Sequence, residues 1–339
     1  MATFTKTPMD GYQRFNKTVT ARAESAHDAA FDSTFERSVD FGKNATLRIT
    51  LRVFFGQIRP WQATAAMMSA AAKVMGLPVT SGVSVGAYPD AKGRSHLIKD
   101  WSGTDWAKFI TEVKRQAMLW DRQFWPVPPD DFVHFDIIDD ARISGHRATA
   151  IRPTVQCEFN FEVAMAQGYA HRSIDVANLL GPGAFTSHET LYDSEDVSPV
   201  QHSGPDWNGV MVNAQQPAIA HEVGHALGLP HIGVSRQRGQ CDLAVVLSQN
   251  FHRESIPALY KDGTNSSACY GTRSNAGDIN NIMGMGSAFG VENARPWLDR
   301  LPLHLNLPAS EFFRVVAGLG RWKVEFSEPS PKSIPVRLP

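Results

Sequence analysis

Three histidines and one glutamate within eleven residues are the side chains in this sequence best suited to bind a metal and activate water. They lie in the segment 221–231, which reads His-Glu-Val-Gly-His-Ala-Leu-Gly-Leu-Pro-His. His221 and His225 are four residues apart, so a helix places both imidazoles on one face, one turn apart. Two imidazole nitrogens can bind one zinc ion at about 2.0–2.1 Å. Glu222 is placed to act as a general base on water rather than to bind the metal.

The residues after this predicted helix supply a turn and a third imidazole. Gly228 lets the chain leave the helix and turn sharply, and His231 follows three residues later, where it can reach the same ion. Three protein ligands leave one coordination position open for water, which is typical of a catalytic zinc site. The alternative is a buried amphipathic helix whose histidines are satisfied by hydrogen bonds. The motif disfavours that alternative because it supplies ligands, a base and a turn together.

The spacing His-Glu-x-x-His-x-x-Gly-x-x-His resembles the signature of the metzincin clan of zinc metallopeptidases. A later segment, Asn-Asn-Ile-Met-Gly-Met-Gly at 280–286, resembles the Met-turn that lies beneath the zinc in that clan, with Met283 as the matching methionine. The resemblance implies that Met283 forms a hydrophobic floor and binds no metal. Two positions depart from the clan's families: Ile232 follows the third histidine, and Met285 stands where some families have a tyrosine. The resemblance therefore identifies the clan and no family within it.

The resemblance implies an α+β fold, namely a metzincin-like catalytic domain with a mixed twisted sheet, an active-site helix and a C-terminal subdomain that contains the Met-turn. It implies a zinc-dependent endopeptidase that acts on proteins or peptides, with one catalytic Zn²⁺ held by His221, His225 and His231 and with Glu222 as general base. Two alternatives stay open. One is a zinc hydrolase of a narrow non-protein or cell-wall amide substrate. The other is a non-catalytic zinc-bearing binding protein, against which the intact Glu222 argues.

Composition and charge are those of an ordinary globular protein. The chain has 339 residues, of which 42% are hydrophobic and 20% charged. A formal net charge of −1 points to no nucleic-acid partner and no anionic membrane, and no apolar run approaches the ~18–20 residues of a membrane span. Residues 1–18 lack the apolar region of a secretory signal. We therefore expect a cytoplasmic protein, export by a signal-independent route, or a processed form of a longer chain.

Three regions are expected along the chain: an N-terminal region over 1–100, the catalytic domain over 101–308, and a C-terminal extension over 309–339. The first combines an extended or loosely packed lead-in over 1–45, a strand and an Ala-rich helix, and is a possible pro-segment or accessory domain. The elements expected from hydrophobic periodicity and turn signals are strands at 47–55, 154–163, 174–180 and 209–212, helices at 61–75, 104–124 and 292–301, and a long loop at 181–206. Thr104 and Asn213 are expected to cap the helices that follow them.

The remaining cysteines and histidines leave alternatives open. Cys241 and Cys269 are able to form a disulfide, whereas the absence of a signal sequence favours a reducing compartment in which they stay free. Cys157 is expected to be a small buried hydrophobic residue. His188 and His202 are expected to be solvent-exposed loop residues rather than a second metal site.

Overall fold

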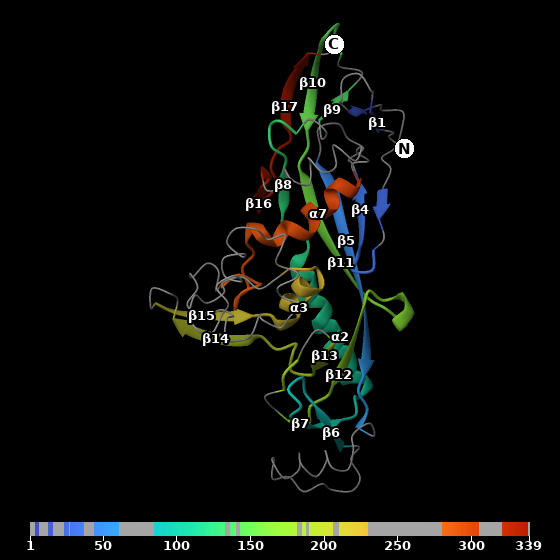
Figure 1. Ribbon diagram of the computed structural model, residues 1–339, viewed down its shortest axis with the longest axis vertical. Helices are drawn as coiled ribbons and strands as arrows, with labels where there is room; N and C mark the ends of the chain where they lie inside the picture. Colours follow the sequence, from blue (N-terminus) through green and yellow to red (C-terminus); the bar gives the residue numbers. More distant parts are fainter. Residues whose placement is uncertain are drawn as a thin grey trace. The chain divides into compact units, whose positions relative to one another are not determined.

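The structure is a computed structural model in which strands outnumber helices (Figure 1). It describes residues 4–6, 13–15, 24–26, 28–36, 44–60, 85–132, 136–139, 143–181, 185–187, 190–205, 210–229, 280–304 and 321–337. The chain forms two compact units. Unit 1 consists of Met1–Leu51, Trp120–Asn160 and Gly290–Pro339, and unit 2 of Arg52–Leu119 and Phe161–Phe289. These units interleave along the chain.

Unit 1 is built mainly from strands. One sheet has the order β1 (Phe4–Lys6), β2 (Gln13–Phe15), β9 (Ile137–Asp139), β10 (Arg147–Arg152) and β17 (Lys332–Arg337). Strands β3 (Glu24–Ala26) and β4 (Asp32–Glu36) form an antiparallel ladder that continues onto the first part of β5 (Ala45–Gln57), which also pairs with β11 (Val155–Val163). The remaining elements are β8 (Trp125–Val127) paired with β16 (Lys323–Glu325), the turn η7 (Val291–Ala294) and the helix α7 (Arg295–His304).

The core of unit 1 follows from alternation on β5 and from aromatic packing on α7. Along β5 the buried side chains are every second residue, among them Leu47, Ile49 and Leu51, as a half-buried strand requires. Trp297 of α7 is fully buried, and its ring stacks on that of Trp120 at a centroid distance of 6.4 Å. The strand expected at 47–55 and the helix expected at 292–301 are therefore confirmed, the latter as η7 followed by α7.

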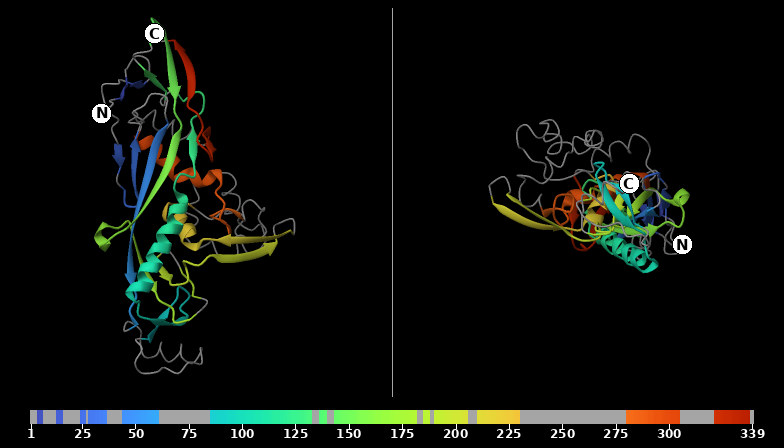
Figure 2. Two further views of the ribbon diagram at one scale, coloured as in Figure 1. Left: turned by 180° about the vertical axis from the view of Figure 1, so that it is seen from behind. Right: turned by 90° about the horizontal axis from the view of Figure 1, so that it is seen from below.

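The described part of unit 2 contains a short parallel sheet, two hairpins and two helices. Strand β12 (Arg172–Ala177) pairs in parallel with the last part of β5 and with β13 (Leu191–Asp193). The hairpins are β6 (Val85–Pro89) with β7 (Ser95–Lys99), and β14 (Val200–Pro205) with β15 (Met211–Gln216). The helices are α2 (Gly103–Ala117), followed by the turn η2 (Met118–Trp120), and α3 (Ala218–Ala226); the turn η5 (Gln167–Tyr169) precedes β12. The β14–β15 hairpin extends away from α2 in both views (Figures 1 and 2).

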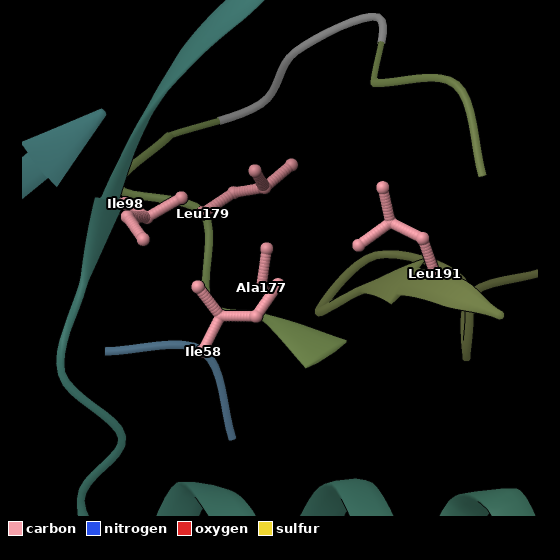
Figure 3. Packing of buried hydrophobic residues seen from close by; sticks show 5 residues of the cluster. All are labelled: Ile58, Ile98, Ala177, Leu179 and Leu191. Carbon is pink, nitrogen blue, oxygen red and sulfur yellow. The ribbon is translucent and has the colours of Figure 1, made fainter. Parts of the chain in front are cut away.

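Apolar side chains from several segments of unit 2 converge on one cluster (Figure 3). Its buried members are Ile58, Ile98, Ala177, Leu179 and Leu191. The Ile98 side chain comes from β7 and the Leu191 side chain from β13, so the cluster ties the β6–β7 hairpin to the parallel sheet. Among the described parts of the chain, no helix is long and apolar enough to cross a membrane.

Helix α2 begins at a different cap from the one expected. Ser102, not Thr104, is the N-cap, and its hydroxyl oxygen accepts a hydrogen bond from the Asp105 backbone N–H at 3.0 Å. The expectation was wrong because serine and threonine are both good caps, and only the backbone conformation selects between them. Ser102 has the required extended backbone, whereas Thr104 already lies within the helix. The helix ends at Ala117, before the apolar positions that were expected to extend it.

Other expectations also differ from the structure. Residues 181–206, expected to be a loop, contain β13 and β14. The described part of residues 1–45, expected to be extended or loosely packed, contains β1 to β4 and the buried Phe35. The predicted cap Asn213 lies inside β15. Cys157 is buried and free, as expected. The helix predicted at 61–75, the predicted Cys241–Cys269 pair and His188 lie outside the described residues.

Two carboxylates of unit 2 lie close together where β13 ends. Asp196 accepts hydrogen bonds from the Ser187 hydroxyl at 2.6 Å and from the Asp193 backbone N–H at 2.8 Å. The Glu195 backbone N–H donates to the Asp193 carboxylate at 2.6 Å. Burial is the main cause that raises the pKa of both Asp193 and Asp196, and repulsion between the two negative charges adds to it for Asp193. As the pH rises, the carboxyl groups of Asp193 and Asp196 therefore keep their protons longer in the folded protein than in the unfolded chain.

We expect Asp193→Asn to remove a pH dependence from the stability of unit 2. A carboxyl whose folded pKa is raised contributes stability at low pH, and this stability is lost as the pH rises through the folded pKa. For Asp193 the loss lies between pH about 4, the unfolded value, and about 7. Above this window the variant should exceed wild type in free energy of unfolding by up to about 4 kcal/mol, since each pKa unit corresponds to about 1.4 kcal/mol. Urea unfolding on both sides of the window measures this, and equal pH slopes for the two proteins would contradict it.

Candidate metal site

The candidate site lies in unit 2, where β15 leads directly into α3. Buried and exposed side chains alternate along β15, so that Val212, Ala214 and Gln216 face inward. Pro217 follows as the N-cap of α3, since its φ of −74° suits the start of a helix. The helix expected around the histidine motif is thus confirmed over Ala218–Ala226.

The two histidines of α3 face each other, as their four-residue spacing predicts. The rings of His221 and His225 have centroids 4.6 Å apart and are nearly perpendicular, at 89°. Their Nε2 atoms lie 3.0 Å apart. His221 is 5% exposed, whereas His225 is partly exposed, so the pair lies at the boundary between the interior and solvent.

Backbone carbonyls hold the opposite nitrogen of each ring. The Nδ1 atom of His225 lies 2.9 Å from the carbonyl oxygen of Leu229, and the Nδ1 atom of His221 lies 2.8 Å from that of Ile282. A carbonyl oxygen only accepts hydrogen bonds, so the contact with Leu229 favours the His225 tautomer that carries the proton on Nδ1. The Nε2 atom of His225 then presents a lone pair toward the His221 ring. The His221 Nδ1 atom has a carbonyl acceptor in Ile282 and a donor in the Gln216 side-chain nitrogen, 2.8 Å away. Hydrogen bonding of the second nitrogen to a carbonyl is the usual way in which proteins orient a metal-binding histidine.

The donor set fits a zinc ion. Two nitrogens bound at about 2.0–2.1 Å to one tetrahedral ion lie about 3.4 Å apart, close to the observed separation of the Nε2 atoms of His221 and His225. The same distance also suits a hydrogen bond between the two rings when the His221 Nε2 atom carries the proton. The third candidate, His231, lies outside the described residues. Among the residues that the structure does describe, no group of three or more histidine, cysteine, aspartate or glutamate side chains is arranged to bind a metal.

A glycine turn ends α3 immediately before the segment that carries His231. Gly228 has φ of +86°, and its N–H donates to the His225 carbonyl at 2.9 Å. The Leu229 N–H donates to the Gly224 carbonyl at 3.0 Å. These two bonds form a Schellman motif with glycine in the left-handed position, which is the role expected for Gly228. The turn also places the Leu229 carbonyl against His225, so one local motif both ends the helix and orients a ring.

The segment resembling a Met-turn adjoins the other histidine. Met283 is fully buried, and its N–H donates to the Asn281 side-chain oxygen at 2.8 Å. The Asn281 carbonyl accepts from the N–H groups of Gly284 and Gly286 at 2.8 and 3.1 Å, which closes the turn. The carbonyl oxygen that contacts His221 belongs to Ile282, the residue before Met283.

Gln216, which no local motif of the sequence marks as a site residue, joins this turn to the helix. Its side-chain nitrogen donates to the Gly284 carbonyl at 2.6 Å and lies 2.8 Å from His221 Nδ1. Its side-chain oxygen lies 3.2 Å from His202 Nε2, which can donate to it. His202, expected to be a loop residue, lies on β14. Its contact orients Gln216 beside the candidate ligand His221. The signal for Gln216 was its position on the buried face of an alternating strand, where a polar side chain requires partners.

Gly286→Ala should disrupt the turn, because a Cβ atom at this position would lie 2.2 Å from the Asn280 carbonyl oxygen. Backbone atoms cannot rotate away as a side chain does, so the turn must shift. We expect a loss of about 2–3 kcal/mol in free energy of unfolding, together with weaker zinc binding, since the Ile282 carbonyl in the same turn holds His221. Urea unfolding and zinc titration measure the two effects. Gly168→Ala is the control, because its Cβ meets nothing within 4 Å.

The remaining predicted site residue, Glu222, lies on α3 beside His221 and is partly exposed. The structure thus brings His221, His225 and Glu222 together on one helix, bordered by the turns that contain Gly228 and Met283. Comparison with known proteins adds no relative: no protein family model, no curated protein and no solved structure matches this chain. Any functional assignment therefore depends on the motif and on this geometry.

Proposed function

We propose that this protein is a zinc-dependent endopeptidase with a metzincin-like catalytic domain. His221, His225 and His231 would hold one Zn²⁺, and Glu222 would be the general base. The observation that carries the proposal is the facing pair of Nε2 atoms, 3.0 Å apart, with both Nδ1 atoms against backbone carbonyls. Two imidazoles that face each other through Nε2 at about this separation have the arrangement of two ligands of one ion.

The chemistry follows from the donor set and from the neighbouring carboxylate. When bound, zinc supplies Lewis acidity and makes water a nucleophile near neutral pH. Glu222 takes a proton from the attacking water and delivers it to the leaving amine. Its partial exposure keeps the carboxylate within reach of solvent and substrate. The carbonyls of Ile282 and Leu229 hold the two rings in place throughout, so these ligands need little reorganisation during the reaction.

The β14–β15 hairpin supports a polypeptide substrate rather than a small amide. Within the described part of the chain, β14 and β15 pair only with each other. An outer strand edge of this kind can accept an extended peptide through backbone hydrogen bonds, which bind many sequences alike. The hairpin leads into α3 through Pro217, and Gln216 at its end contacts His221. A peptide held along this hairpin would therefore lie near the candidate ligands.

A search for newly formed peptide termini tests the proposal. Zinc-loaded protein is incubated with a complex peptide mixture, and the products are identified by mass spectrometry. New termini that disappear when zinc is removed by a chelator and return when zinc is restored would support an endopeptidase and would report its cleavage preference. A zinc-loaded protein that generates no termini from peptides but releases amine from small amides would support the narrow amide hydrolase instead. Protein that binds no zinc would overturn the proposal.

A further inference from the structure

Gln116 is a fully buried polar residue on a helix face that is otherwise apolar. The other buried side chains of α2 are Phe109, Val113 and Ala117. Burial of an amide without hydrogen-bonding partners costs about 1–3 kcal/mol, so a glutamine at this position needs partners that use both its nitrogen and its oxygen.

The Gln116 side chain has such partners on three segments of unit 2. Its nitrogen donates to the Val197 carbonyl at 2.5 Å and to the Glu112 carboxylate at 3.2 Å. Its oxygen accepts a hydrogen bond from the backbone N–H of Ile219 at 3.2 Å. One side chain therefore joins α2 to the segment between β13 and β14 and to the first turn of α3.

The contact with Ile219 replaces a missing helix cap. The first N–H groups of a helix have no partner within it, and a Ser, Thr, Asp or Asn side chain at the N-cap normally accepts from one of them. Here the N-cap is Pro217, which makes no side-chain hydrogen bond to the helix. Gln116 supplies the acceptor from a different helix. The N–H group that it accepts from belongs to Ile219, two residues before His221 in the sequence. The start of the helix that carries the candidate ligands is thus held by a residue outside the proposed ligand set.

We infer that Gln116 is a positioning residue for the metal site: it caps α3 from outside and so sets the position of His221 and His225 relative to the Ile282 carbonyl. This inference rests on the proposed zinc site. The three bonds also make the position of α3 depend on the 194–198 turn through Val197. Loss of the Gln116 amide would leave the Ile219 N–H without this acceptor and would loosen the first turn of α3, which carries His221. A pair of metal ligands needs a fixed geometry.

Gln116→Leu tests the inference, because leucine has a similar volume and no hydrogen-bonding group. The control is Phe109→Leu on the same helix, which disturbs the packing against Phe55, Trp101 and Trp106 and leaves the cap intact. Two quantities are compared in the full-length proteins. The first is zinc affinity, measured by competition with a chelator. The second is amide hydrogen exchange of the peptide that contains Ile219, measured in the metal-free proteins.

We expect Gln116→Leu to weaken zinc binding about 10-fold, the lower end for residues that support ligands from outside, and to speed exchange of the Ile219 peptide. Phe109→Leu should lower the melting temperature at least as much and change zinc affinity less than 3-fold, about 0.7 kcal/mol or less. Equal zinc affinity for Gln116→Leu and wild type, or an equal loss in both variants, would overturn the inference and leave the proposed function standing. A wild-type protein that binds no zinc would overturn both, and faster exchange in Gln116→Leu alone would then identify a purely structural cap.

Discussion

Glu222→Gln should abolish most peptide cleavage while zinc binding stays intact. The amide keeps the size of the carboxylate but cannot take a proton from water at neutral pH, and general-base catalysis contributes about 10²–10⁴-fold to a rate. We therefore expect cleavage of a peptide identified in the terminus search to slow by about 10³-fold. Zinc affinity should change little, because the proposed ligands are histidines and the backbone carbonyls that orient His221 and His225 are untouched.

The control for this variant is Glu325→Gln, which alters an exposed glutamate on β16 in unit 1. Its activity and zinc content should equal those of wild type. Undiminished cleavage by purified, zinc-loaded Glu222→Gln would remove Glu222 from the reaction. Loss of zinc in this variant would instead make Glu222 part of the metal-binding set. Kinetics and elemental analysis on the same preparation separate the two results.

The local part of the candidate site could be predicted from the sequence because its signals are local. A four-residue spacing is sufficient to place His221 and His225 on one helix face, and a glycine three residues after His225 is sufficient to predict the turn. The structure has both features: the facing rings and the left-handed Gly228. The proposed role of the histidines as zinc ligands stays a prediction, and so does the position of His231.

The partners that hold this helix could not be predicted, because they come from distant parts of the chain. Asn213 was the expected cap by local rules, yet it lies in β15, and the acceptor for the first turn comes from Gln116, 103 positions before Ile219. Likewise, the carbonyl that contacts His221 belongs to a residue 61 positions later. Local rules for capping assume that a helix satisfies its own ends, and a helix with proline at its N-cap must find its acceptor elsewhere.

The strands in 181–206 were missed for a related reason. Strand β13 has only three residues, and its parallel pairing with β12 is a contact that no local pattern reports. The residues of β14, Val-Gln-His-Ser-Gly-Pro, show little alternation and end in turn formers. They are a strand because β15 pairs with them in register, from Val200 opposite Gln216 to Pro205 opposite Met211. Tertiary pairing thus overrides a sequence that reads as a loop.

His225→Ala should remove most of the affinity for zinc. The variant takes away one proposed ligand and leaves the Leu229 carbonyl without its imidazole partner, but α3 keeps its Schellman turn through the backbone bonds of Gly228 and Leu229. Structural zinc sites bind with about 10–16 kcal/mol, so loss of one of three protein ligands should weaken binding by at least about 10³-fold. Zinc retained after dialysis against a chelator, measured by elemental analysis, reports the effect.

Two further variants make the result specific. His146→Ala changes an exposed histidine in unit 1 and should retain as much zinc as wild type. His231→Ala should lose zinc as fully as His225→Ala, because the motif assigns the third coordination position to this residue. Full retention by His231→Ala, together with loss in His225→Ala, would leave the two facing imidazoles as ligands and require a different third donor. Full retention in both variants would return the helix to its other interpretation, a pair of histidines held by hydrogen bonds to Ile282 and Leu229.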